Sequence, residues 1–79
     1  MPPDQMLDQW FRRVHEYDRV ISSFEKVVQN LRVRRNTASD GTMLSIDAQL
    51  KLYERTLEGM RKGRSVAMAE VDRLTKGGG

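Results

Sequence analysis

The chain has 79 residues, no cysteine and one histidine, and its 14 lysines and arginines outnumber 11 aspartates and glutamates for a net charge of +3. This composition excludes disulfides, thiolate metal sites and histidine clusters, and the length allows one small domain. A single core of this size rarely contributes more than ~3–5 kcal/mol, so we expect partner helices to supply further stability.

A long helix is predicted over residues 4–35, where no glycine or proline interrupts the pattern. Two prolines suit its first turn, and Asp4 can cap the free backbone N–H groups there. Apolar residues recur at alternating spacings of three and four, which keeps one helix face toward a partner helix. This first apolar seam consists of Leu7, Trp10, Val14, Tyr17, Ile21, Phe24, Val28 and Leu31. Phe11, Val20 and Val27 widen the face, which favours burial by more than one neighbour.

A polar turn is predicted over residues 36–42, because its short polar side chains satisfy local backbone groups and its glycine accepts positive φ. Thr42 or Ser45 can cap a second helix over residues 43–75, followed by a glycine-rich tail at 76–79. The second apolar seam consists of Met43, Ile46, Leu50, Tyr53, Leu57, Met60, Ala67, Val71 and Leu74. Arg64 occupies its one polar position.

A turn this short returns the second helix antiparallel to the first. We therefore predict an all-α, antiparallel two-helix hairpin that forms one domain over residues 1–79 and is completed by oligomerisation or a partner chain. Large side chains should face small ones: Trp10 faces residues 67–69, and Tyr17 lies near Gly63. The other expected neighbours are Met60 for Tyr17 and Tyr53 for Phe24.

Gly59 and Gly63 each cost roughly 1 kcal/mol relative to alanine inside a helix. We interpret them as room for close packing, with a weak point that bends or melts as the alternative. Met6, Met43, Met60 and Met68 lie on or beside the seams. They are interpreted as core filler, with an adaptable partner groove as the alternative.

No arrangement of catalytic groups stands out in the sequence. His15 has no partner of matching spacing, and Glu54 and Glu58 have arginines and lysines close by for ordinary surface pairing. Phosphate-binding loops, metal-spaced clusters and nucleophile elbows are absent from the sequence. We expect a protein that is not an enzyme and uses no cofactor or metal.

Basic residues gather in two clusters, one at the end of the first helix and one within the second. They are Arg32, Arg34, Arg35, Arg61, Lys62 and Arg64. Acidic residues are interspersed along both helices, and cations complement the dipole at a helix C-terminus. We expect a solvated face, with a nucleic-acid or acidic-partner patch as the alternative.

An early tryptophan at position 10, a long first helix, a short polar turn and a second helix ending in residues 69–74 (AEVDRL) resemble small helical-hairpin components of bacterial type III secretion systems. Two branches are similar: the needle subunits, and the co-chaperones that keep them unpolymerised in the cytosol. Needle subunits carry a Pro-Ser-x-Pro turn, whereas residues 36–40 contain no proline. That difference favours the co-chaperone branch or an unrelated hairpin.

These observations predict a protein–protein interaction module that buries its apolar faces against partner helices or a second copy. The expected partner-binding residues are Trp10, Phe11, Tyr17, Val20, Phe24, Val27, Tyr53 and Met60. The alternative function is a small basic nucleic-acid-binding hairpin. The sequence contains neither a signal-peptide pattern nor a membrane-spanning run. We expect a cytoplasmic location, with export by a route that reads no cleavable signal as the alternative.

Overall fold

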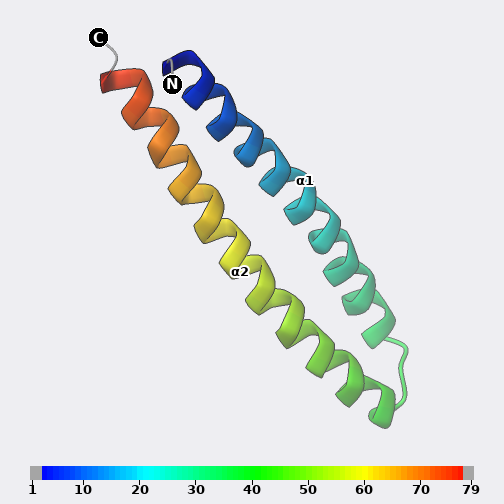
Figure 1. The fold of residues 1–79 in the computed structure, drawn as a ribbon. Helices are drawn as coiled ribbons and strands as arrows, with labels where there is room; N and C mark the ends of the chain where they lie inside the picture. The colour runs from blue at the N-terminus through cyan, green and yellow to red at the C-terminus, as the bar shows by residue number, and fades with distance from the viewer. Residues whose placement is uncertain (1–2, 78–79) are drawn as a thin grey trace.

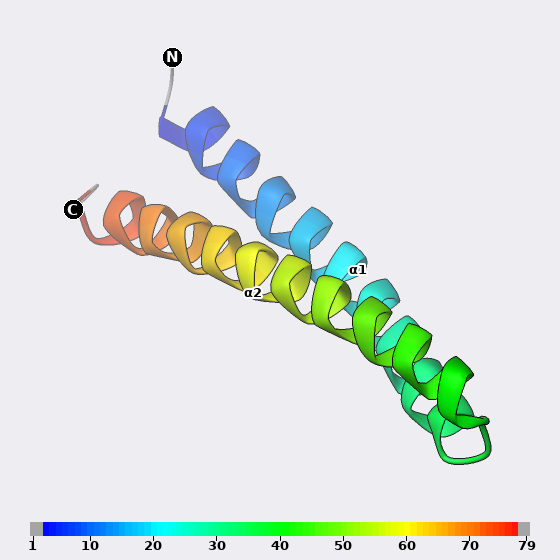
Figure 2. The same cartoon turned by 90° about the horizontal axis from the view of Figure 1, so that it is seen from below.

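Two long antiparallel helices make up the computed structural model, which describes residues 3–77 (Figure 1). Helix α1 spans Pro3–Arg35 and helix α2 spans Asp40–Gly77. The start of α1 and the end of α2 lie at the same end of a rod measuring 59 × 16 × 15 Å. Viewed from below, the helices cross at a shallow angle (Figure 2). The predicted all-α, antiparallel two-helix hairpin is confirmed.

The connection between the helices is tighter than the sequence suggested. At the end of α1, the backbone N–H groups of residues 36–38 donate to carbonyls three positions earlier, over 3.2–3.3 Å. The predicted turn over residues 36–42 is therefore too long. Helix α2 begins at Asp40, before the expected start at residue 43. It also continues through Gly77, beyond the expected end at residue 75, while Gly78 and Gly79 lie outside the described residues.

Ser39 lies immediately before α2, in the position we had expected Thr42 or Ser45 to fill. The N–H of Met43 donates to the Ser39 carbonyl over 2.8 Å, which is the first bond of the helix. The Ser39 hydroxyl donates to that of Thr42 over 3.1 Å. Gly41 falls inside this first turn, and none of the described residues has a positive φ. The expectation of positive φ at this glycine is therefore corrected. The side chain of Asp4, the expected cap of the first helix, lies outside the described residues.

The core follows the two predicted seams and divides into two clusters. The larger cluster, toward the turn, contains Ile21, Val28, Leu31, Ile46, Leu50 and Leu57. The smaller one, toward the termini, contains Val14, Ala67 and Val71, with Leu7, Trp10 and Met68 packed against it. The clusters separate near the level of Tyr17 and Arg64, where the second seam has its polar position. Most seam residues are therefore buried by contacts between the two helices of one chain.

Candidate interaction surface

The side chains expected to bind a partner have two different environments. Most pack against the core of the hairpin itself and are partly buried; these are Trp10, Tyr17, Phe24, Tyr53 and Met60. Phe11, Val20 and Val27 instead remain exposed, at 42%, 42% and 38%. The second group is therefore the part of the predicted surface that is available to another molecule.

The exposed side chains belong to two flanks of the first seam. Val20 and Val27 each precede a seam residue, and they share a row at heptad spacing. Phe11 follows a seam residue, in the row that continues through Asp18 and Glu25. Because each residue turns a helix by about 100°, these rows lie on opposite sides of the seam. Phe11 is thus separated from the two valines.

Helix α2 adds exposed apolar residues that the seam spacing does not include. Leu52 and Val66 are 65% and 61% exposed on one side of α2, whereas Leu44, at 73%, lies on the other side, beside Asp47 and Glu54. Thr56 and Gly59 lie between Leu52 and Val66 at helical spacings of four and three, and a Cβ added at Gly59 would have nothing within 4 Å. We call Val20, Val27, Leu52, Thr56, Gly59 and Val66 the uncharged face. Leu52, Gly59 and Val66 each precede a residue of the second seam, so the sequence alone could have identified the α2 part of this face.

An open hollow of about 390 Å³ lies beside Val20, with Tyr17 and Met60 of the two helices among its lining residues. Tyr17 lies against Gly63, as expected from the sequence. A Cβ added there would come within 2.5 Å of the Tyr17 hydroxyl oxygen and 2.7 Å of the ring carbon that carries it. The packing interpretation therefore applies to Gly63. No packing contact explains Gly59, which is open.

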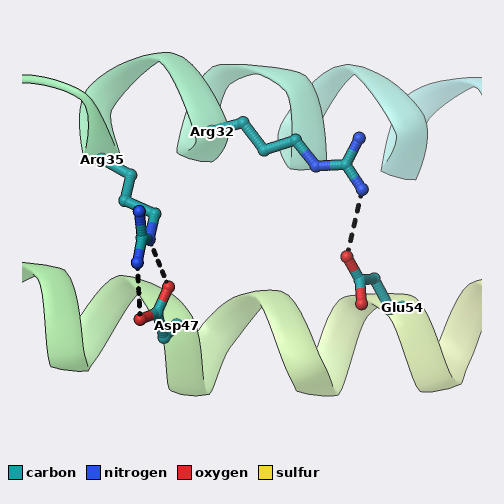
Figure 3. A network of polar contacts seen from close by, with 4 residues as sticks. All are labelled: Arg32, Arg35, Asp47 and Glu54. Atoms are coloured by element: carbon teal, nitrogen blue, oxygen red, sulfur yellow. Dashed lines mark hydrogen bonds and ion pairs between the residues drawn. The ribbon is translucent and has the colours of Figure 1, made fainter.

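Among the described residues, four ion pairs join the helices along the flank opposite the uncharged face. The Arg35 guanidinium donates twice to Asp47, over 2.6 and 3.3 Å (Figure 3). Arg32 donates to Glu54 over 3.1 Å in the same view. Toward the termini, Arg61 pairs with Glu25 over 3.4 Å and Arg64 with Asp18 over 2.5 Å. We call these eight residues the ion-pair edge.

The signs along the ion-pair edge reverse midway. Helix α1 supplies the acids Asp18 and Glu25 toward the termini, and the bases Arg32 and Arg35 toward the turn. A slip of one heptad in either direction would therefore bring Glu25 toward Glu54 or Arg32 toward Arg61. The edge favours one register of the hairpin.

The interhelical pair of Arg35 and Asp47 shifts the pKa of both groups. The hydrogen bond from Arg35 lowers the pKa of the Asp47 carboxyl, and partial desolvation opposes that shift. The same hydrogen bond raises the pKa of Arg35. Both side chains are about 40% exposed, so water and salt weaken their attraction.

The basic residues predicted as a patch are mostly engaged with acids of the same chain. Arg32, Arg35, Arg61 and Arg64 belong to the ion-pair edge, and Lys62 pairs with Glu58 over 3.5 Å. Arg34 alone among the six has no acid within ion-pair distance in the described part of the chain. The sequence missed the four pairs between the helices because their acids come from the other helix, whereas Lys62 and Glu58 belong to the same helix.

Little in the described chain suggests reaction chemistry. Within residues 3–77, no three histidine, aspartate or glutamate side chains are placed to hold a metal ion. Neither described helix has an apolar stretch long enough to cross a membrane. The chain matches none of the protein-family models, curated proteins or solved structures with which it was compared.

Proposed function

We propose that this hairpin is a non-enzymatic interaction module that packs its uncharged face against a helix of another chain. One observation carries the proposal: the hairpin leaves Val20, Val27, Leu52 and Val66 exposed along one flank, while its ion pairs occupy the other. Contiguous exposed apolar residues mark binding surfaces more often than scattered ones do. The partner is either a second copy or a different protein.

The architecture also supports a more specific proposal. The chain resembles co-chaperones of type III secretion, which hold a helical subunit unpolymerised by covering its apolar surface. A two-helix rod with one unused apolar flank could cover a third helix in the same way. We therefore propose a co-chaperone or assembly subunit of such an apparatus as the biological setting.

Nucleic-acid binding is the weaker candidate. Phosphate binding needs arginines and lysines whose charge is free to replace counterions. Here all but Arg34 of the predicted basic patch pair with carboxylates of the chain. Those carboxylates would repel a phosphate backbone at the same places.

Site-specific photo-crosslinking tests the proposed function. A benzophenone amino acid replaces Val20 or Val66 on the uncharged face, and Gln29 or Lys51 on the other flank serves as the control. The chain is then produced and irradiated in its own cells. We expect covalent protein adducts from positions 20 and 66 only. Adducts that form equally from the control positions, or from none of the four, would contradict the proposal.

A further inference from the structure

We infer that the partner of the uncharged face is an acidic amphipathic helix from a different protein. This inference rests on the function proposed above and specifies the chemistry of the partner. It follows from how the charges of the hairpin are divided between its two flanks. Arg13, Arg19 and Arg34, which form no ion pair among the described residues, lie beside the exposed valines, whereas the four carboxylates of the ion-pair edge lie on the other flank.

On α1, basic residues frame the exposed valines. Arg13 and Arg34 stand at the two ends of the row that contains Val20 and Val27, at the same heptad spacing. A second row, one position earlier and on the side of α1 away from α2, carries exposed Arg12, Arg19 and Lys26. Arg13 and Arg19 border the hollows on either side of Val20, whereas Lys26 borders a hollow at the ion-pair edge. The α1 half of the face is therefore apolar along its middle, with Arg13 and Arg34 at its ends and Arg19 beside Val20.

On α2, exposed Arg55 lies one turn from Leu52, along the outer side of the same face. The described residues place no carboxylate within ion-pair distance of the unpaired bases on either helix. Glu16 is the one acid that borders the hollows beside Val20. The four carboxylates of the ion-pair edge are on the other flank and already engaged.

This charge pattern disfavours a second copy as the occupant. Two copies packed through the uncharged face would bring Arg13, Arg19 and Arg34 toward the same arginines or toward Arg55. Like charges facing each other across an interface are destabilising and select against that pairing. A nucleic acid would satisfy the bases but leave Leu52 and Val66 uncovered.

An acidic amphipathic helix satisfies both features of the surface. Apolar side chains at helical spacing would cover Val20, Val27 and Val66, and Gly59 would allow a close approach. Glutamates beside that apolar stripe would meet Arg13, Arg19 and Arg34. The result is a three-helix assembly in which acids of the partner pair with arginines of this flank that pair with no carboxylate among the described residues.

The test uses three fluorescein-labelled helical peptides of about four heptads with one shared apolar stripe. Their flanking positions carry glutamate, glutamine or lysine, and fluorescence anisotropy measures binding to the full chain at low and high salt. We expect the glutamate peptide to bind about tenfold more tightly than the glutamine peptide at low salt, and the lysine peptide not to bind. High salt should reduce the difference between the first two.

Two charge variants locate the effect on the surface. Arg13→Gln, Arg19→Gln and Arg34→Gln together should weaken binding of the glutamate peptide about tenfold. The control variant, Arg32→Gln with Lys51→Gln and Arg61→Gln, removes the same net charge from the other flank and should change affinity less than about twofold, because those groups lie far from the peptide. Circular dichroism verifies that both variants stay helical.

Several results would overturn the inference. Equal binding of the three peptides would show that charge does not select the partner, while leaving the interaction module itself intact. Failure of all three to bind would also reject it, and the crosslinks would then decide the proposed function separately. Tighter binding of a labelled oligonucleotide, or a dimer in sedimentation equilibrium that Val66→Glu dissociates, would replace the acidic helix by another occupant.

Discussion

Gly59 and Gly63 look alike in the sequence and differ in their surroundings. Gly59 has open space where a Cβ would be, whereas Gly63 lies directly under the ring of Tyr17. The sequence predicted a small residue near Tyr17 from hairpin pairing. It could not separate the two glycines, because a single turn of helix decides which of them meets the ring.

Alanine substitutions should therefore have opposite effects. Gly59→Ala should stabilise the hairpin by about 1 kcal/mol, since alanine favours the helix and nothing obstructs it. Gly63→Ala should destabilise it by about 1 kcal/mol net, because crowding of ~1–3 kcal/mol outweighs the gain in helix propensity. Urea unfolding measures both. In a Tyr17→Leu background the Gly63→Ala penalty should disappear, and a persistent penalty would mean that the ring is not its cause.

Trp10 is only partly buried, although it packs where the sequence expected it. It contacts the cluster of Val14, Ala67 and Val71, and the Arg13 guanidinium lies 4.6 Å from its ring centre. Trp10→Ala should cost about 2–3 kcal/mol, less than the ~3–5 kcal/mol of a fully buried aromatic. Chemical unfolding of the purified variant measures the loss. A change near zero would place Trp10 outside the folded core.

Asp47 should make the stability of the hairpin depend on acidic pH. Its carboxyl pKa is lowered from 3.8 by the hydrogen bond from Arg35, so its ionised form favours the folded state. This contribution is fully present above the ordinary carboxyl pKa and is lost as pH falls through the lowered value. The melting temperatures of the wild type and of Asp47→Asn, measured between pH 6 and pH 2, should become equal at the acid end of this range. Curves that stay parallel throughout would exclude this linkage.

The helices themselves were predictable because their signal is repeated over many turns. From Val14 to Leu31 the first seam keeps the same alternation of three and four residues. The second seam keeps it as well, and one polar position, Arg64, does not hide the pattern. The ends were less certain, since Ser39, Thr42 and Ser45 are all acceptable caps. Leu52 and Val66 were missed because the predicted face followed only the seam of the second helix and not the row beside it.

The ion-pair edge should contribute more to register than to stability. Arg61→Glu would place a second acid beside Glu25 and should destabilise the hairpin by up to about 1 kcal/mol, because the pair is exposed. Adding Glu25→Arg restores opposite charges with the signs exchanged, and should recover most of the loss. The comparison of the two single variants with the double variant in urea gives the coupling energy. A coupling near zero at low salt would rule out an energetic role for this pair.

The complete rod has two flanks with different roles. One flank joins α1 to α2 through charges, and the other leaves valine and leucine side chains beside unpaired arginines. Heptad reasoning on the sequence predicted the hairpin and its wide apolar face. It placed Phe11 with Val20 and Val27, although the heptad positions put Phe11 on the opposite side of the first seam. What the sequence alone did not say is that the row of Phe11 carries the ion pairs between the helices.

The central claim is that the uncharged face serves association and not folding. The double variant Leu52→Gln and Val66→Gln tests it most directly, with photo-crosslinking from position 20 and urea unfolding measured on the same preparation. We predict unfolding within about 0.5 kcal/mol of wild type, as for exposed positions generally, together with loss of the crosslinked adduct. A loss of folding stability above about 2 kcal/mol, or an adduct of unchanged yield, would contradict the account.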